Sequence, residues 1–209
     1  MIVLITHEES QRVMTEFLKA GHDAYSCDLL PASGSYPERH LQMDCFEAIK
    51  KIKPDFLGMH PECTRLTVAA NKYYKPEYAE RFPTIHQDRL EAVAHFFNCA
   101  MALKEVGKGY IENPVGIMSR LYRKPNQIIQ PYQYGHTERK GTCLWLEGLP
   151  NLEPTNMVEP DIIVLKSGKT VSRMHYETFK LPKEERRKAR SKTFKGIAEA
   201  MATQWGKTT

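Results

Sequence analysis

The sequence predicts a doubly wound α/β domain built on a mostly parallel central sheet. Short apolar runs alternate with amphipathic stretches from residue 2 to residue 112, and this alternation is typical of β-α-β units. The first run, MIVLIT, is apolar along almost its whole length, which indicates a strand buried on both faces of a parallel sheet.

The first half of the chain supplies most of this pattern. We expect strands at residues 1–6, 23–27, 56–60 and 110–112, and helices at residues 11–20, 46–52 and 84–104. Gly21 follows the first helix as a natural stop, and Thr84 stands where it would cap the third. Residues 61–83 have no clear period and predict a long loop with one helical turn, of the kind that serves as a lid or binding loop.

In the second half of the chain, the alternation of apolar runs and amphipathic stretches ends after residue 150. Strands are expected at residues 128–134 and 142–146, then a hairpin around Ser167 and Gly168, a basic helix and a final amphipathic helix. We expect a single domain over residues 1–209, with a small insertion at 147–192 and a C-terminal helix at 193–206 that returns to the core.

The composition favours a cytoplasmic protein without a membrane segment. No apolar stretch is long enough to span a bilayer, and the first residues lack the basic leader of a signal peptide. The five cysteines are scattered without a C-x-x-C pair, which favours reduced thiols and excludes both a disulfide framework and a zinc-finger pattern. We therefore expect no metal site.

Positive charge gathers near the end of the chain. The formal net charge is +5, and residues 183–195 hold seven Lys and Arg against two Glu. Such a segment is either a solvated helix face or a set of phosphate contacts for a nucleic acid or nucleotide.

Several familiar motifs fail on spacing. Gly168-Lys169-Thr170 lacks the earlier glycine of a P-loop, because position 163 is Ile. No G-x-G-x-x-G follows the first strand, and Cys63 lacks the second cysteine of a zinc deaminase. His60, alone at a strand end, is more typical of packing than of metal binding.

Polar side chains instead follow five successive strand regions, where ligands bind in doubly wound sheets. These groups are His7 to Ser10, Asp28, Asp44, His60 to Thr64, and Glu112 to Pro114. Taken alone, Cys63 is an inert loop thiol and Glu112 a solvated acid. On neighbouring strand ends, they make a nucleophile and an acid.

That pair suits addition to a pyrimidine. Loop dipoles or a nearby cation such as Arg65 would raise the population of the Cys63 thiolate. The thiolate attacks carbon 6 when a carboxyl group protonates or hydrogen-bonds N3, and carbon 5 then becomes nucleophilic enough to take a methyl group. An acid after the second strand, Asp28, suits the ribose hydroxyls of a nucleoside-containing cofactor.

Five short stretches follow one another in a recognisable order: EESQ (8–11), CDLLP (27–31), MDC (43–45), HPECT (60–64) and IENPVG (111–116). This order resembles that of the DNA (cytosine-5) methyltransferases. The stretches GHDAYSCDLLPASG, IENPVGIMS, KPNQIIQPYQYGH and KGTCLWLEGLPNL are similar to short phage- and prophage-type proteins grouped with that family. The final RSKTFKGIAEAMATQW resembles the family's C-terminal segment that folds back beside the cofactor.

The resemblance implies a Rossmann-like methyltransferase fold, S-adenosylmethionine as cofactor and DNA as partner, in the host cytoplasm if the gene is phage-borne. Cys63 would be the nucleophile and Glu112 the partner of N3, acting on a cytosine flipped out of the duplex. The cofactor side would comprise Glu9 and Ser10 in the first loop, Asp28 at the ribose, Asp44 at the adenine, and Pro61. On the substrate side, Asn113 would brace the active-site strand, and Arg139 and Lys140 would support the base and the nucleophile loop.

Three departures from the family pattern keep two alternatives open. Glu9, Ser10 and Gln11 replace a glycine-rich loop, Glu62 replaces the proline before the nucleophile, and the recognition region is at most residues 147–192. A carboxylate beside a thiol opposes thiolate formation. The alternatives are an enzyme that modifies a free pyrimidine nucleotide, and a non-catalytic protein that binds a nucleotide or a partner.

Overall fold

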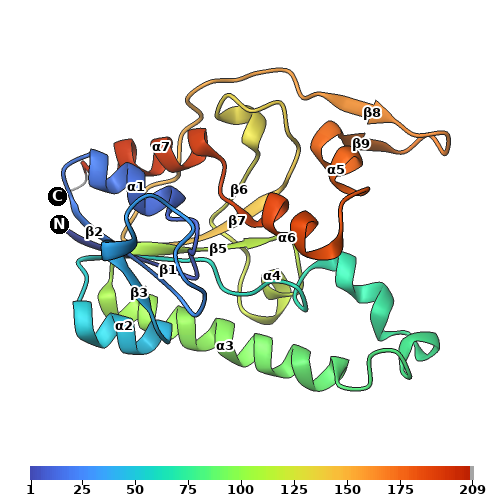
Figure 1. Cartoon of the computed structure of the whole chain (residues 1–209), viewed down its shortest axis with the longest axis horizontal. Helices are drawn as coiled ribbons and strands as arrows, with labels where there is room; N and C mark the ends of the chain where they lie inside the picture. Colours follow the sequence, from blue (N-terminus) through green and yellow to red (C-terminus); the bar gives the residue numbers. More distant parts are fainter. Residues whose placement is uncertain (208–209) are drawn as a thin grey trace.

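A seven-stranded sheet runs through the centre of the molecule in the computed structural model (Figure 1). The structure describes residues 1–207, apart from the side chains of Lys183, Glu184, Arg187 and Lys188. The strand order is β3-β2-β1-β4-β5-β7-β6. The strands are β1 (Ile2–Thr6), β2 (Asp23–Asp28), β3 (His40–Gln42), β4 (Phe56–Met59), β5 (Gly109–Pro114), β6 (Gln127–Ile129) and β7 (Thr142–Glu147).

The predicted doubly wound α/β class is confirmed, with a Rossmann-like, mostly parallel sheet. Strands β3, β2, β1, β4 and β5 pair in parallel, and β7 runs antiparallel between β5 and β6. Strand β4 is buried along its whole length and β1 along all but its first residue, as expected for strands covered on both faces.

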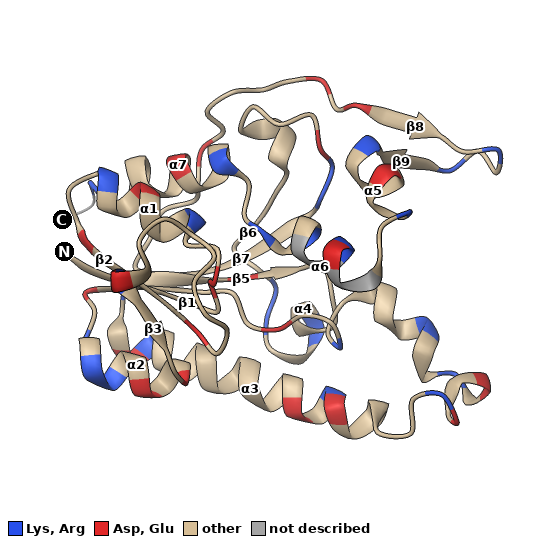
Figure 2. Cartoon of the chain, in the orientation of Figure 1, with Lys and Arg blue, Asp and Glu red and all other residues tan. Residues whose placement is uncertain are grey.

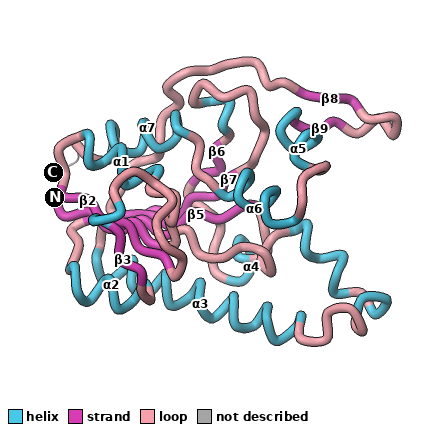
Figure 3. Tube along the Cα trace, in the orientation of Figure 1, coloured by secondary structure: helices cyan, strands magenta, loops and turns pink. Residues whose placement is uncertain are grey.

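Helices cover the sheet in two layers (Figures 1 and 3). Helices α1 (Arg12–Lys19) and α7 (Lys195–Trp205) pack together on one face, over Val3 and Ile5. Helices α2 (Cys45–Ile52) and α3 (Ile85–Val106) pack on the other, over Leu4. Because successive side chains of a strand point to opposite faces, the residues of β1 divide between the two cores.

The long loop at 61–83 is more ordered than the sequence predicts. It contains two 3₁₀ helices, η2 (Val68–Tyr74) and η3 (Pro76–Tyr78), rather than one helical turn. Arg89 of α3 stacks on the Tyr74 ring at 3.3 Å and donates to the carbonyl of Arg65, which ties the loop to α3. Thr84 occupies the cap position of α3, but its side chain accepts no hydrogen bond from the helix.

The predicted strand at 128–134 is wrong in its second half. Strand β6 ends at Ile129, and Pro131 opens a 3₁₀ helix, η4 (Pro131–Gln133). Proline has no N–H to donate to a ladder and its fixed φ suits the first position of a helical turn, so the strand ends before it. A short helix, α4 (Met118–Leu121), lies between β5 and β6, and the 3₁₀ helix η1 (Pro37–Arg39) precedes β3.

The predicted hairpin after residue 150 is confirmed. Strands β8 (Ile162–Val164) and β9 (Thr170–Ser172) form a separate two-stranded sheet, and Gly168 adopts the positive φ of 76° that the turn requires. Helices α5 (Arg173–Thr178) and α6 (Lys183–Ser191) follow. Among the helices of the described residues, none is long and apolar enough to cross a membrane.

Helix α6 is coloured partly blue for Lys and Arg in Figure 2. Two of its arginines make hydrogen bonds within the protein. Arg190 donates to the Thr178 hydroxyl at 2.7 Å and to the His175 carbonyl at 2.7 Å, and Arg186 donates to the Leu181 carbonyl at 3.1 Å. Arg190 thus holds α6 against α5, and Arg186 ties α6 to the segment before it, which the sequence did not indicate. Lys183, Arg187 and Lys188, which belong to the predicted phosphate-contacting set, have side chains outside the described part.

Candidate active site

The carboxyl ends of β1, β2, β4 and β5 meet at one edge of the sheet. Strand order reverses between β1 and β4, and in doubly wound sheets such a reversal opens a crevice beyond the strand ends. The loops that carry Ser10, Asp28, Cys63 and Glu112 all begin at this edge, because their strands run in parallel. The predicted common rim is therefore confirmed.

The loop after β4 forms a tight turn around Cys63. The backbone carbonyl of Cys63 accepts hydrogen bonds from the N–H groups of Leu66, at 2.9 Å, and Thr67, at 3.1 Å. The Glu62 carboxylate accepts from the Thr64 N–H at 2.8 Å and from the Thr64 hydroxyl. Glu62 is thus turned along its own loop, and the Cys63 side chain is half-buried.

The stretch after β5 comes close to this loop. The Ile117 N–H donates to the Leu66 carbonyl at 2.9 Å. A Cβ at Gly116 would lie 2.2 Å from that carbonyl oxygen, closer than any side chain permits. Only glycine therefore allows the two segments to lie this close.

A buried hydrogen bond joins the two strand ends. Asn113 is 2% exposed, and its side-chain nitrogen donates to the Pro61 carbonyl at 2.9 Å. Strand β4 pairs directly with β5, so this bond fixes the Cys63 loop relative to Glu112. The expected bracing role of Asn113 has a physical basis here.

His60 and Tyr110 lie beside Glu112. The His60 Nε2 is 2.8 Å from the Tyr110 hydroxyl and 4.0 Å from a Glu112 carboxylate oxygen. Burial lowers the pKa of His60, which keeps the ring neutral, although Glu112 acts in the opposite direction. His60 was expected only to pack, yet it contacts the proposed acid. Its position one residue before a buried proline was the available signal.

The Cys63 thiol is protonated at neutral pH. Burial, followed by the Glu62 and Glu112 carboxylates, raises the pKa of Cys63 to about 11, and Lys140 acts in the opposite direction. We expected Arg65 to favour the thiolate, and this is wrong: Arg65 pairs with Asp88 of α3 at 2.7 Å. Lys140 supplies the positive charge instead.

Lys140 and Arg139 serve different places. Lys140 acts electrostatically on both Cys63 and His60, and its ammonium donates to the Arg190 carbonyl at 2.9 Å. Arg139 is exposed and lines a groove between β7 and the hairpin, together with Gln130, Thr170 and His175.

The first loop is built around a buried acid that the sequence did not single out. Glu8 is 3% exposed, and its carboxylate accepts from the N–H groups of Val13, at 2.6 Å, and Met14, at 3.1 Å, at the start of α1. Burial raises the pKa of Glu8 to about 8, against the effect of these hydrogen bonds. Glu8 therefore fills the anion-binding position at the helix N-terminus.

Glu9, Ser10 and Gln11 contact the segment that follows β2. The Ser33 hydroxyl donates to the Glu9 carboxylate, and a Cβ at Gly34 would lie 2.9 Å from the Ser10 carbonyl. Gln11 is fully buried and bonds through its side chain to the Ser26 hydroxyl and to the backbone of Tyr36. His7 and Gln11 have positive φ angles of 58° and 55°. Residues other than glycine adopt this backbone conformation only at a cost in energy.

Asp28 and Asp44 lie at the ends of adjacent strands. Each already accepts local backbone hydrogen bonds: Asp28 from Leu30 at 2.9 Å, and Asp44 from Phe46 and Glu47 at the start of α2. Within residues 1–207, these hydrogen bonds use the Oδ1 atom of each carboxylate and leave Oδ2 toward a ligand. Leu29 and Leu30 are 72% and 46% exposed beside Asp28. An acid flanked by exposed apolar side chains fits a nucleoside, whose ribose is polar and whose base is flat and apolar.

Comparison with models of protein families gave no match, and a search of curated proteins found no similar sequence. The functional argument therefore depends on the residues and on their arrangement.

Proposed function

We propose that this protein is an S-adenosylmethionine-dependent methyltransferase acting on carbon 5 of cytosine, in DNA, through a covalent Cys63 adduct. The observation that carries the proposal is the Asn113–Pro61 hydrogen bond, which holds the Cys63 loop beside Glu112 at the edge where ligands bind. The resemblance of five ordered motifs to the cytosine-5 methyltransferases supports the same chemistry.

The roles of the side chains follow from their chemistry. Glu112 in its protonated form donates to N3 of the base, which makes carbon 6 electrophilic, and the Cys63 sulfur adds there. Carbon 5 gains nucleophilic character as the C5–C6 double bond is lost. S-adenosylmethionine, when bound, supplies an electrophilic methyl group. The C5 proton then leaves to a base, and the C6–S bond breaks to release Cys63.

Lys140 favours the thiolate in this scheme. The pKa of Cys63, about 11, must be overcome in the complex, and Lys140 is the cation that acts on the thiol. A flipped base in the site would exclude water and strengthen that attraction, because the effective dielectric falls.

Asp28 and Asp44 would hold the nucleoside part of the cofactor. The free carboxylate oxygen of Asp28 suits the ribose hydroxyls, and Leu29 and Leu30 offer apolar contact to the adenine. Glu8 occupies the start of α1, so an anionic group of the cofactor would need another partner.

The experiment measures transfer of tritiated methyl groups from the cofactor to mixed-sequence duplex DNA. We expect incorporation with wild type and none with Cys63→Ser. Glu105→Gln, at an exposed position near the C-terminal end of α3, is the control. An oligonucleotide carrying 5-fluorocytosine would additionally trap the adduct, since fluorine cannot leave as the proton does. Equal incorporation by wild type and Cys63→Ser would overturn the proposal.

Free pyrimidine nucleotides are the second candidate substrate. Residues 148–192 carry only a hairpin and two short helices, and Arg186 and Arg190 are engaged within this segment. Competition between dCMP and duplex DNA separates the two substrates. If DNA is bound, we expect log affinity to fall with log salt, and Arg139→Ala to reduce the slope by about 1.

Binding without catalysis is the third possibility, favoured by the raised pKa of Cys63 and by the closed contacts of Gln11. Calorimetric titration with S-adenosylmethionine distinguishes an enzyme from a protein that only binds. Micromolar binding of the cofactor favours an enzyme, and absence of binding favours a module that captures a nucleotide or a partner.

A further inference from the structure

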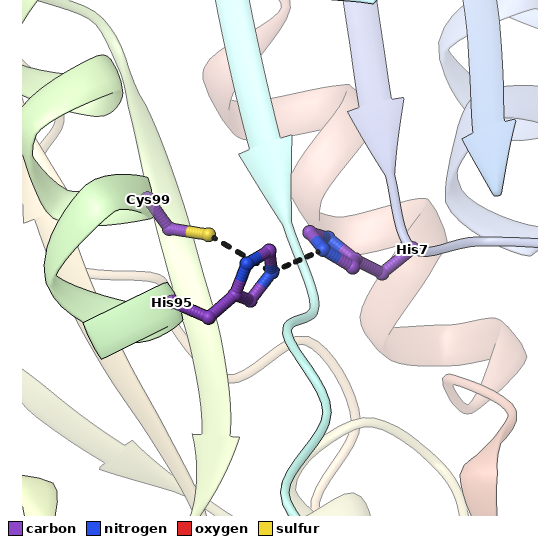
Figure 4. Close-up of side chains that lie close together, drawn as sticks. All are labelled: His7, His95 and Cys99. Carbon is purple, nitrogen blue, oxygen red and sulfur yellow. Dashed lines mark hydrogen bonds between the residues drawn. The ribbon is translucent and has the colours of Figure 1, made fainter. Parts of the chain in front are cut away.

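Four metal-binding side chains from three separate elements converge below the carboxyl end of β1. His7 follows β1, and His95 and Cys99 lie one turn apart on α3; Figure 4 shows these three side chains pointing toward one another. Cys45 is the first residue of α2. Residues four apart lie on the same face of a helix, so His95 and Cys99 point to the same place. The site is on the opposite face of the sheet from α1 and α7 (Figure 1).

The ligand atoms lie close enough together that shifts of about 0.5–1 Å would bring them to the spacing of a tetrahedral ion site. The Nε2 atoms of His7 and His95 are 2.8 Å apart, and the His95 Nε2 is 3.6 Å from the Cys99 sulfur. All three ligand atoms lie within 4.8 Å of one another. With bonds of about 2.0–2.1 Å to nitrogen and 2.3 Å to sulfur, tetrahedral zinc holds its ligand atoms about 3.3–3.8 Å apart.

Cys45 is the next donor to this group. Its buried thiol lies outside the 4.8 Å group, at the start of α2, and interacts with the side chains of Cys99 and His7. Both thiols are buried and reduced, with Cys45 5% and Cys99 0% exposed. Two thiols and two imidazoles form a donor set that favours zinc.

The histidines are held in the orientation that ligation needs. The Thr6 hydroxyl is fully buried and lies 3.0 Å from the Nδ1 of His7. When the hydroxyl accepts the Nδ1 proton, the Nε2 of His7 keeps its lone pair toward the cluster. The Phe46 ring packs edge-on against His95 at 5.6 Å and closes one side with apolar surface.

A groove borders this cluster on its His95 side. Its lining comprises Glu62, Thr64, Arg65, Asp88, Glu91, Ala92 and His95. Three carboxylates against one arginine make the groove favourable for a cation, and His95 is half-buried in its wall.

We propose that His7, Cys45, His95 and Cys99 bind one Zn²⁺ ion in a closed, tetrahedral, structural site. Four protein ligands leave no open position for water, so the ion would connect elements rather than catalyse. It would tie the loop after β1 to α2 and α3 and would hold His7 at its positive φ. This inference does not depend on the methyltransferase proposal.

Cobalt tests the site directly. The full chain, stripped with a chelator under reducing conditions, is titrated with Co²⁺ and then with Zn²⁺. We expect one ion per chain, with the visible bands of tetrahedral cobalt and a near-ultraviolet thiolate-to-metal band, both lost as zinc displaces cobalt. Cys99→Ser and His95→Ala are expected to weaken binding at least about 100-fold, because each removes a direct ligand. Cys143→Ser and His86→Ala, which change a buried thiol and an exposed histidine of α3, are expected to bind as wild type does.

Two further measurements keep the test decisive if a ligand variant fails to fold. Thr6→Val preserves shape and removes the hydroxyl, so we expect about 10–100-fold weaker zinc binding. The melting temperature of wild type is expected to fall when a chelator is added and to recover with Zn²⁺. Equal cobalt binding by wild type and Cys99→Ser, a melting temperature indifferent to chelator, or a Cys45–Cys99 disulfide in reducing buffer would each overturn the proposal.

Discussion

Two thiol-containing sites lie at the same end of the sheet, and their neighbours differ. Cys63 is a single half-buried thiol between the carboxylates of Glu62 and Glu112, with Lys140 as the opposing charge. Cys45 and Cys99 are buried together among two imidazoles. The interaction between the two thiols lowers the pKa of Cys45 and raises that of Cys99.

The difference teaches that neighbours, more than burial, decide what a thiol is suited to. Burial raises the pKa of both Cys63 and Cys99. An acid beside Cys63 can serve a reaction in which a proton moves to the base while sulfur adds to it. Neutral nitrogen and sulfur donors around Cys99 suit an ion that displaces their protons.

The sharpest test of this contrast replaces one cysteine thiol at a time with a serine hydroxyl. Cys63→Ser is expected to lower methyl transfer by at least about 10⁴-fold, as removal of a nucleophile does. The zinc content of the same variant is expected to equal that of wild type, measured by elemental analysis. Loss of zinc from Cys63→Ser would show that the two sites are not separate.

Cys99→Ser is expected to behave in the opposite way. Loss of a buried ligand lowers the free energy of unfolding by about 2–5 kcal/mol, read from urea denaturation in the presence of zinc. With chelator added, the gap to wild type is expected to narrow, since both proteins then lack the ion. A gap that chelator leaves unchanged would indicate a packing defect only.

Asn113→Ala tests the connection between strand ends at the Cys63 site. It removes the donor to the buried Pro61 carbonyl and is expected to cost about 1–3 kcal/mol of stability. We expect kcat to fall about 10–100-fold with little change in cofactor affinity, because the Cys63 loop shifts relative to Glu112. Asn98→Ala, at an exposed position on α3, is the control.

Glu8 lies near both sites and predicts a pH dependence. Burial raises its folded pKa from the ordinary 4.5 to about 8, so the folded state binds the proton more tightly than the unfolded state. The stability from this group is full below pH 4.5 and is lost as pH rises through about 8, at no more than about 1.4 kcal/mol per pH unit. Glu8→Gln is expected to flatten the loss in urea denaturation between pH 6 and 9, while Glu9→Gln keeps it.

Glu62→Gln gives the smallest expected effect and the most local one. Removing this carboxylate lowers the pKa of Cys63, so we expect alkylation by iodoacetamide at pH 8 to accelerate by several-fold up to about 10-fold. Glu47→Gln, on the exposed side of α2, is the control. An unchanged rate would mean that burial alone sets the reactivity of the thiol.

The alternation of apolar runs was sufficient to predict the sheet class, the main helices and the edge where the loops meet. The strands β1 and β4 were predictable because burial on both faces leaves a continuous apolar signature. The end of β6 was missed because strand-forming residues continue beyond Pro131. The proline cannot donate a hydrogen bond to the sheet, so the strand ends before it. The antiparallel direction of β7 depends on tertiary pairing with β5, which no local pattern records.

The two sites differ in how far the sequence could reveal them. Cys63 and Glu112 were found because both lie at the carboxyl ends of neighbouring strands, and parallel strands bring such positions together. The cluster of His7, Cys45, His95 and Cys99 has no local spacing, and only His95 and Cys99 share a helical period. Lys140 replaced Arg65 as the partner of Cys63 because Arg65 is drawn to Asp88 on α3, a contact between segments 23 residues apart.

Helix α7 packs on helix α1, although about 180 residues separate them in the chain. Val13 and Phe17 share one core with Ile197, Met201 and Trp205. During synthesis, the apolar side of α1 therefore stays uncovered until nearly all of this sequence has left the ribosome. The earlier strands can pair in that interval, but this helical layer is completed last. A nascent chain stalled before residue 195 would therefore expose the apolar face of α1 to chaperones.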